Sequence, residues 1–339
     1  MNSIFPVQRT EDITMKIVKP NYFNLFKCIA DKCPDTCCAG WDVEIDDISA
    51  ERYKEESGSL KKLFDKHLTT DEDGYVFTLT DGRCPMLDEK NLCRIQLEKG
   101  ESGLCDTCRL FPRYFDDYGE IREIGLGLGC PEAARILLSP ETDVSLGESV
   151  ESPDRIYNLL SEKRNEFFAI LDNKQFDLKM KLSAVLFSAA ELQSEIDQAD
   201  MLGGDSTVDF SECVAVLEKM EYISESRRSK LLSLSEQAAI YNNSEKYGED
   251  FIRLFKYYLM RYMMTACFDL DLLTKVKYGI FACIVTKRLY NSVPQLSFYD
   301  RVRILYGYSK EVEYSPINLD ILDDAMYNDF TVAELVNLL

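Results

Sequence analysis

Nine of the twelve cysteines in this 339-residue chain lie between Cys28 and Cys130, and this clustering limits what the chain can fold into. The chain has a single histidine, His67, which excludes a histidine-rich metal site and most histidine-based acid–base chemistry. In a reducing compartment, clustered thiols indicate metal binding rather than disulfides. The sequence therefore predicts a metal-binding region in the first half of the chain.

Other features of the sequence predict a cytoplasmic protein without a membrane partner. Residues 1–14 contain no apolar segment and do not resemble a signal peptide. The most apolar region, 251–268, is interrupted by three basic residues, which argues against a membrane span. The net charge of −20, from 39 basic and 59 acidic residues, argues against nucleic acid as a partner, because phosphates need clustered Lys and Arg.

The hydrophobic pattern predicts a mainly α fold with two halves. Residues 15–138 are the Cys-rich domain, in which we expect short helices and small β-hairpins around turns such as Asp81-Gly82. Residues 139–154 are polar, contain two prolines and predict a linker. In residues 155–339, apolar side chains recur at i, i+3 and i+4, which predicts a C-terminal helical bundle.

Individual elements follow from local patterns. The apolar stripes that predict helices span residues 156–171, 178–192, 251–262 and 272–284. The first of these stripes places Ile156 and Leu159 toward the core. Strand signals lie at 75–80 and on both sides of a turn at Gly119.

The clustered cysteines occur in short motifs that suit metal ligation. Pro34 suits the first turn of a helix, which would place Cys33 and Cys37 on one face. A predicted hairpin lies between Cys84 and Cys93. The candidate ligands are Cys28, Cys33, Cys37, Cys38, Cys84, Cys93, Cys105, Cys108 and Cys130. The remaining cysteines, Cys213, Cys267 and Cys283, lie in apolar runs and are predicted to pack in the core.

The chemistry of the ligands limits which metals can bind, but it does not identify one metal. Thiolates without histidine favour zinc, copper(I) or an iron–sulfur cluster over magnesium or calcium. Four cysteines would hold a structural zinc, and a [4Fe–4S] cluster needs about four as well. Nine exceed the need of one such site, so either some of them pack in the core or a second site exists. The spacing does not decide between zinc and iron, or which four cysteines ligate.

Longer stretches resemble two related bacterial families. The cysteine motifs at 33–38, 84–87, 93–95 and 108–112 resemble the Cys-rich family described as zinc- or iron-chelating. A longer resemblance is to the flagellin lysine N-methylase family, and its motifs are PNYF at 20–23, CCAGW at 37–41, LCDTCRLFPR at 104–113 and CPEAA at 130–134. This resemblance implies methyl transfer from S-adenosylmethionine to lysine side chains of flagellin, and a bound iron–sulfur cluster.

Three residues near the cysteines are candidates for binding S-adenosylmethionine. Arg109 and Arg113 could pair with its carboxylate or neutralise the charge of a cluster. Alternatively, they could pair with nearby acids such as Asp106 and Asp116. The ring of Trp41 could stack on the adenine or face the sulfonium, or it could belong to the core.

The sequence does not single out a catalytic base. A lysine must lose its ammonium proton before it can accept a methyl group, and a carboxylate or a tyrosine could remove that proton. The acids that crowd the first cysteine cluster are Asp31, Asp35, Asp42, Glu44 and Asp46. These acids could equally form a solvated face, and His67, in a charged stretch, is expected at the surface.

The run Gly125-Leu-Gly127-Leu-Gly129 mimics the first motif of Rossmann-type methyltransferases. That motif requires a buried strand before the glycines and a helix after them, and residues 117–122 do not predict such a strand. We therefore expect a glycine-rich strand that approaches Cys130 instead of a cofactor loop.

Two functions other than methyl transfer stay open. The main alternative is a non-catalytic zinc- or iron-binding Cys-rich protein. Thiol redox chemistry at Cys105-x2-Cys108 is weaker, because no thioredoxin-like βαβ pattern surrounds that pair.

Overall fold

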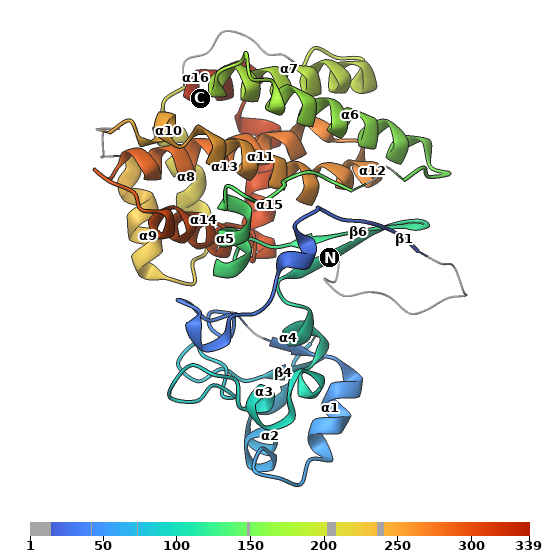
Figure 1. Ribbon diagram of the computed structural model, residues 1–339, viewed down its shortest axis with the longest axis vertical. Coiled ribbons are helices and arrows are strands. Elements are labelled where there is room, and N and C mark those ends of the chain that lie inside the picture. Colours follow the sequence, from blue (N-terminus) through green and yellow to red (C-terminus); the bar gives the residue numbers. More distant parts are fainter. Residues whose placement is uncertain (1–14, 42, 73, 148–149, 202–207, 236–240) are drawn as a thin grey trace.

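The chain folds into a large helical body and a smaller Cys-rich part that projects from it (Figure 1). The computed structural model describes residues 15–41, 43–72, 74–147, 150–201, 208–235 and 241–339. The expectations for residues 1–14 and for Asp42 lie outside these ranges. The predicted mainly α fold, with short helices and small sheets in the Cys-rich half, is confirmed.

Short elements make up the Cys-rich part. They are β2 (Val43–Ile45), α1 (Asp47–Lys54), α2 (Lys61–His67), β3 (Leu68–Thr70), β4 (Tyr75–Phe77), α3 (Arg94–Lys99) and α4 (Asp106–Leu110). The strands form an antiparallel sheet in the order β2-β4-β3. The rings of Tyr53, Phe64 and Phe77 stack on one another and form the centre of a small hydrophobic core.

His67 is buried, so the prediction that it lies at the surface was wrong. It follows Leu60 and Phe64 at a spacing that places all three side chains on one face of α2. Leu60 and Phe64 belong to the small core, and the charged neighbours of His67 point to other faces of the helix. The charged stretch therefore gave a wrong prediction for His67, because a helix points the side chains of adjacent residues in different directions.

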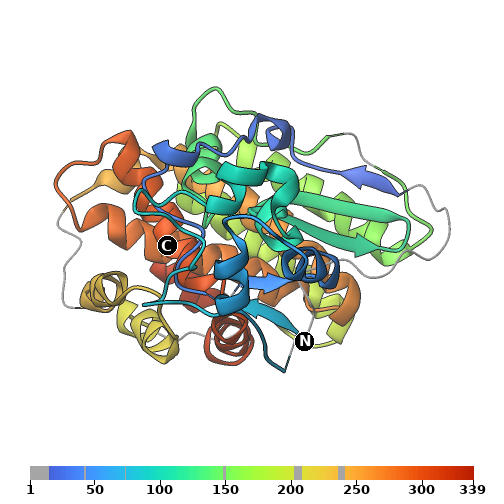
Figure 2. The same ribbon diagram turned by 90° about the horizontal axis from the view of Figure 1, so that it is seen from below.

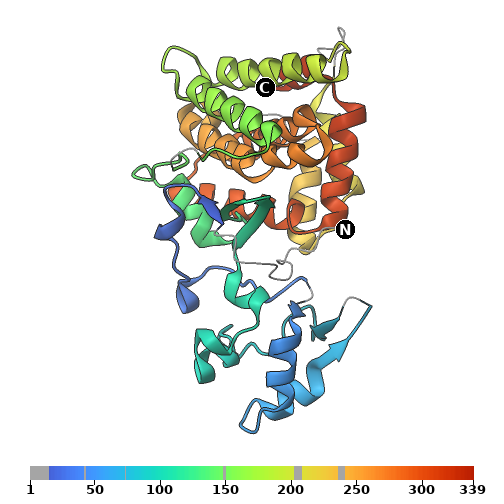
Figure 3. The same cartoon turned by 90° about the vertical axis from the view of Figure 1, so that its right-hand side faces the viewer.

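A second sheet lies against the helical body (Figure 3). Its strands are β1 (Lys16–Val18), β5 (Arg113–Tyr118) and β6 (Ile121–Leu126). β1 runs parallel to β6, and β5 pairs with β6 antiparallel through the predicted turn, where Gly119 adopts a φ of +64°. The helix α5 (Pro131–Leu138) follows, and both the sheet and this helix contribute to the core of the helical body.

The two cores divide the chain in a way that apolar periodicity does not reveal. Residues 43–105 surround the small core, whereas β1, β5, β6 and α5 belong to the large one. The bounds 15–138 and 155–339 therefore stay a prediction. The described residues of 139–154 form neither helix nor strand. Arg253 nevertheless holds the start of this segment, since its Nη1 donates to the carbonyls of Ser139 at 2.9 Å and Thr142 at 3.0 Å.

The helical body contains the remaining helices. They are α6 (Arg155–Asp172), α7 (Leu178–Asp197), α8 (Phe210–Lys219), α9 (Glu225–Leu232), α10 (Asn243–Lys246), α11 (Gly248–Arg261), α12 (Ala266–Asp269), α13 (Leu272–Asn291), α14 (Phe298–Val312), α15 (Pro316–Asp324) and α16 (Val332–Leu338). The four predicted stripes are confirmed as α6, α7, α11 and α13. α13 is buried almost throughout and packs against α7, α11 and α14. None of the described helices combines the length and the apolar surface that crossing a bilayer requires.

Seen from below, the Cys-rich part lies over the helical body, and the chain passes between the two parts near α4 and α5 (Figure 2). The loop before β2 and the turn before α3 lie near the first turn of α5, which begins at Pro131 after Cys130. This junction is where the candidate ligands gather.

The inner face of α6 differs from the predicted one. Ile156 and Leu159 are exposed, whereas Tyr157 and Arg164 are buried. The Arg164 guanidinium donates to both carboxylate oxygens of Glu123 on β6, at 2.7 and 2.8 Å, and Tyr157 donates its hydroxyl to the same carboxylate at 2.7 Å. A charged residue at an inner position cannot be predicted from apolar periodicity.

The buried pair predicts a stability difference that denaturation can measure. Arg164→Met leaves the Glu123 carboxylate buried without its cation, so we expect the free energy of unfolding to fall by about 3–5 kcal/mol in urea denaturation. The matched control is Arg228→Met, which removes an exposed pair with Glu225 and should cost at most about 1 kcal/mol. Equal losses in the two variants would contradict this account.

Candidate metal centre

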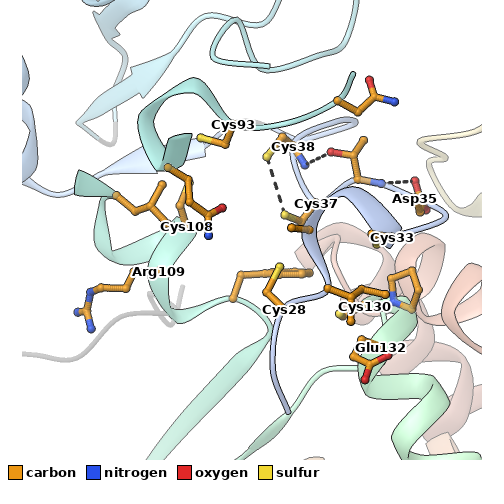
Figure 4. Close-up of a pocket in the computed structure, with 18 of the residues that line it drawn as sticks. Cys28, Cys33, Asp35, Cys37, Cys38, Cys93, Cys108, Arg109, Cys130 and Glu132 are labelled. Carbon is orange, nitrogen blue, oxygen red and sulfur yellow. Dashed lines mark hydrogen bonds between the residues drawn. The ribbon is translucent and has the colours of Figure 1, made fainter. Parts of the chain in front are cut away.

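A cavity of about 340 Å³ lies where the Cys-rich part meets α5 (Figure 4). Seven of the nine candidate ligands line it, and they are Cys28, Cys33, Cys37, Cys38, Cys93, Cys108 and Cys130. They come from the loop before β2, the turn before α3, the helix α4 and the start of α5. Cysteines far apart in the sequence therefore face one space.

The other two candidates, Cys84 and Cys105, lie behind the cavity wall and are buried in the small core. The amide of Cys84 donates to the carbonyl of Cys38 at 2.8 Å, which joins the second cysteine motif to the first. Cys105 immediately precedes α4, and Cys108 lies in its first turn. A hydrogen bond between these two thiols lowers the pKa of Cys105 and raises that of Cys108.

The loop that contains Cys33, Cys37 and Cys38 is not helical, so the predicted helix after Pro34 was wrong. A 3₁₀ turn at Ala30–Lys32 ends at Cys33, whose extended backbone, with ψ at 128°, suits a residue before proline. The Asp35 side chain then accepts the amide of Thr36 at 2.7 Å, and the Thr36 hydroxyl accepts the amide of Cys38 at 3.1 Å. Side-chain hydrogen bonds therefore replace helical ones in this loop.

Two cations of the helical body hold the same loop in place. Lys310 on α14 donates to the carbonyl of Thr36 at 2.7 Å and contacts the Asp35 carboxylate at 3.2 Å. Arg227 on α9 pairs with Asp35 at 2.9 Å and with Glu311 at 2.8 Å. Because Lys310 is only 3% exposed, this contact is a buried connection between the two parts of the molecule. We call Lys310, Arg227 and Asp35 the loop clamp.

The thiols influence one another in two overlapping groups. The first group faces α5, and it comprises Cys28, Cys33, Cys37 and Cys130. The second group faces α4, and it shares Cys37 with the first group; its other members are Cys38, Cys84, Cys93, Cys105 and Cys108. Burial raises the pKa of Cys84 and Cys130 to about 12, and neighbouring thiolates add to the rise at both. Several thiolates can therefore coexist here only beside a cation.

The donor atoms are thiols, which suit a thiolate-bound metal, but only some of them already lie at the spacing of metal ligands. The sulfurs of Cys37 and Cys38 are 3.8 Å apart, which is about the separation of two thiolates on a tetrahedral ion with Zn–S bonds of about 2.3 Å. In the described part of the chain, no three Cys, His, Asp or Glu side chains lie close enough together to hold one ion. Metal binding therefore has to draw further thiols toward this pair.

All three residues predicted to bind a cofactor line the cavity. Arg109 pairs with Asp106 at 2.6 Å, as the simpler alternative predicted. Asp116 pairs with Arg261 instead of Arg113, and in the described ranges Arg113 forms no ion pair. Its guanidinium lies over the Phe26 ring at 5.1 Å and is available to an anion in the cavity.

Trp41 belongs to the cavity wall and to an aromatic cluster. Its ring stacks on Tyr314 with centroids 5.3 Å apart, and it lies 6.1 Å from the Phe111 ring. Lys310 of the loop clamp lies over the Trp41 ring at 5.0 Å. The two alternatives for Trp41 are therefore compatible, because a residue that packs on Tyr314 also borders the cavity.

The expected glycine-rich strand is β6, which contains Gly125, and a turn and a helix follow it. β6 leads into the glycines, and α5 follows them. The turn is filled, however, because a Cβ at Gly127 or Gly129 would overlap the Tyr314 ring. These glycines make room for Tyr314, and the strand approaches Cys130 as expected.

Few of the predicted acids reach the cavity. Asp35 lines it but is engaged in the loop clamp, and Asp46 caps α1 instead by accepting the amide of Ser49 at 2.9 Å. Two acids that were not predicted, Glu101 and Glu132, also line the cavity. Glu132 pairs with Arg135 at 2.8 Å, whereas Glu101 is exposed.

Comparisons with known proteins agree with this site. Residues 27–125 match the family model described as "putative zinc- or iron-chelating domain". The chain is 29% identical to the flagellar biosynthetic protein FliU of Salmonella muenchen over 39% of this chain and 82% of that protein. It is also 29% identical to a lysine-N-methylase of Salmonella typhimurium, over 39% of this chain and 35% of that protein. The chain is similar to lysine-N-methylases over part of its length.

A second lysine-N-methylase, from Salmonella choleraesuis, matches over the same shares of each chain. The predicted resemblance is thereby confirmed, although the match covers only about a third of the length of these lysine-N-methylases. No solved structure matches the chain. The comparisons therefore support the family and the metal-chelating domain.

Sequence reasoning missed the residues that support the cavity from the helical body. Lys310, Arg227 and Tyr314 lie at least 190 residues from the loop that they contact. No local pattern reports a contact of that separation. The cysteines predicted to pack in the core do so, since Cys213 and Cys283 are buried and Cys267 packs partly buried against the large core.

The cavity predicts which cysteines matter for metal content. Cys37→Ser and Cys108→Ser should each lower bound metal and soluble yield together, because ligation contributes folding energy to a part with a small core. Elemental analysis of the purified variants measures this. Cys267→Ser, outside the cavity, is the control and should keep its metal. Full metal content in both ligand variants would show that other residues bind it.

The thiol pKa values predict a pH dependence of metal binding. Because burial holds Cys84 and Cys130 as neutral thiols below a pKa of about 12, a metal that binds such thiols has to displace their protons. Apparent zinc affinity should therefore rise with pH, by about tenfold per pH unit for each proton released. Competition with a chelator of known pH dependence measures this, and a pH-independent affinity would contradict it.

Proposed function

We propose that this chain is a protein-lysine N-methyltransferase that transfers methyl groups from S-adenosylmethionine to lysine side chains of flagellin. The observation that supports it most is a thiol-lined cavity in a chain similar to lysine-N-methylases, and this cavity includes Arg113, which has no ion-pair partner among the described residues. The name of the relative FliU supports a flagellar protein as substrate. The proposal includes a cytoplasmic location, where thiols stay reduced.

The proposed metal centre is a [4Fe–4S] cluster or zinc, held by four of the nine candidate cysteines. The vicinal pair Cys37 and Cys38 is the natural starting point, because its sulfurs are already spaced as two ligands of one centre. When bound, such a centre supplies folding energy and, if it has an open coordination position, a place for the amino and carboxylate groups of the methyl donor.

Residues of the cavity wall have separate roles in this proposal. Arg113 pairs with the donor's carboxylate, because its guanidinium has no protein carboxylate as a partner in the described ranges. The rings of Trp41 and Phe111 offer apolar faces to the adenine and the sulfonium. The target lysine has to lose its ammonium proton beside them before the methyl group is transferred, since an ammonium has no lone pair to accept it.

Mass spectrometry of flagellin tests the enzymatic proposal. After anaerobic incubation with metal-loaded protein and S-adenosylmethionine, we expect lysine residues of flagellin to gain the mass of one or more methyl groups. Arg113→Met should reduce the initial rate by about tenfold or more at low donor concentration, because a charge-assisted pair to the carboxylate is lost. Unmodified flagellin under cluster-replete conditions would contradict the proposal for that substrate.

A non-catalytic metal-binding protein is the second candidate, and the match of residues 27–125 to a chelating domain favours it. An absorption spectrum after anaerobic purification separates the metals. Broad visible absorption with matching iron and sulfide indicates a cluster, whereas a colourless protein with stoichiometric zinc indicates a zinc site. Zinc together with unmodified flagellin would favour the second candidate.

A further inference from the structure

A carboxylate next to the cavity has an unusual set of partners. Glu313, the residue that follows α14, accepts hydrogen bonds from three tyrosine hydroxyls of α11 and its end. These tyrosines, which we call the tyrosine cluster, are Tyr257 at 2.6 Å, Tyr258 at 3.0 Å and Tyr262 at 2.9 Å. Three neutral donors thus meet two carboxylate oxygens.

Glu313 has no cation of its own. In the described ranges it forms no ion pair with Lys or Arg, although buried carboxylates are normally paired. The nearest guanidinium, that of Arg261, lies over the Tyr262 ring and pairs with Asp116 at 3.1 Å. The charge of Arg261 is therefore matched by Asp116, and the charge of Glu313 is left over.

The position of Glu313 is deep but not closed. Burial is the main influence on its carboxyl group and raises its pKa, and the tyrosine hydroxyls oppose that rise. Glu313 and its neighbour Tyr314 nevertheless keep part of their surface accessible. Glu313 therefore borders accessible space, whereas the tyrosines that donate to its carboxylate are buried.

Two short paths connect Glu313 to the thiol-lined cavity. Tyr314, the next residue, stacks on Trp41 of the cavity wall at 5.3 Å. On the other side, the hydroxyl of Tyr257 contacts the amide of Leu128 at 3.4 Å, and Leu128 lies two residues before Cys130. The carboxylate thus lies directly behind the wall that Trp41 and the glycine turn form.

We infer that Glu313 and the tyrosine cluster bind the ammonium group of the substrate lysine, an inference that rests on the proposed function. An ammonium has three N–H donors and no acceptor. Glu313 Oε1 accepts from Tyr258 and Oε2 from Tyr257 and Tyr262. The Tyr257 oxygen already accepts the amide of Leu128, whereas the oxygens of Tyr258 and Tyr262 keep acceptor capacity. This cluster of oxygens therefore offers an ammonium several charge-assisted hydrogen bonds.

The chemistry favours a lysine over the methyl donor as the occupant. The sulfonium of the methyl donor is also cationic, but it has no N–H group and cannot use the tyrosine and carboxylate oxygens as acceptors. The donor's amino group does have N–H donors, but the proposed function places that group at the metal centre, together with the carboxylate. The acids of the cavity itself are engaged or exposed, since Asp35 and Glu132 are paired and Glu101 faces solvent. Glu313 differs from these acids because protein largely surrounds it while, in the described ranges, it forms no ion pair.

Ligand-observed NMR on the full-length protein tests this inference without requiring methyl transfer. The probes are Nα-acetyl-lysine methylamide, its norleucine analogue without the ammonium, and S-adenosylmethionine. We expect the wild type to bind the lysine probe better than the norleucine probe. Glu313→Gln, which removes the charge at nearly constant shape, should weaken lysine binding by about tenfold or more and leave S-adenosylmethionine binding unchanged.

The matched control is Glu218→Gln on the exposed face of α8, which should bind lysine as the wild type does. Glu313→Asp keeps the charge and should recover part of the affinity lost in the glutamine variant, and it replaces that variant if the latter does not fold. Unchanged lysine affinity in Glu313→Gln, absent lysine binding by the wild type, or a loss confined to S-adenosylmethionine would each overturn the inference. Lysine binding at Glu313 together with unmodified flagellin would instead contradict only the proposed function.

Discussion

The loop clamp is the contact on which the candidate site depends. Thiols from four separate segments face one cavity, and the loop with Cys33, Cys37 and Cys38 has no helix or strand of its own to hold it. Lys310 and Arg227, both from the helical body, fix that loop through Asp35. The cavity therefore requires both parts of the molecule, and a Cys-rich segment cut away from its helices would lose the loop's anchors.

The overall fold could be predicted where one physical rule dominates. Apolar periodicity predicted α6, α7, α11 and α13, because those helices bury a stripe against the core. It failed on the inner face of α6, where Arg164 is buried through its pair with Glu123, and at His67, which a helix turns inward. A partner that is distant in sequence explains the buried Arg164, and the geometry of α2 explains the buried His67.

The residues that line the site could be predicted from the sequence, but the contacts that hold them in place could not. The cysteines, Trp41 and Arg113 were recognisable because thiol clustering and family motifs are local features of a sequence. The helix expected after Pro34 was wrong, since side-chain hydrogen bonds and the clamp impose a different backbone on that loop. Glu313 gave no signal either, because its tyrosine partners meet it only through tertiary packing.

The central claim is that sulfur from the clustered cysteines alone holds a metal between the Cys-rich part and the helical body. X-ray absorption spectroscopy at the edge of the bound metal tests this most directly on the full-length, anaerobically purified protein. We predict a first coordination shell dominated by sulfur, at about 2.3 Å for zinc, and a loss of sulfur ligands in Cys37→Ser. A first shell of nitrogen and oxygen in the wild-type protein would contradict the account.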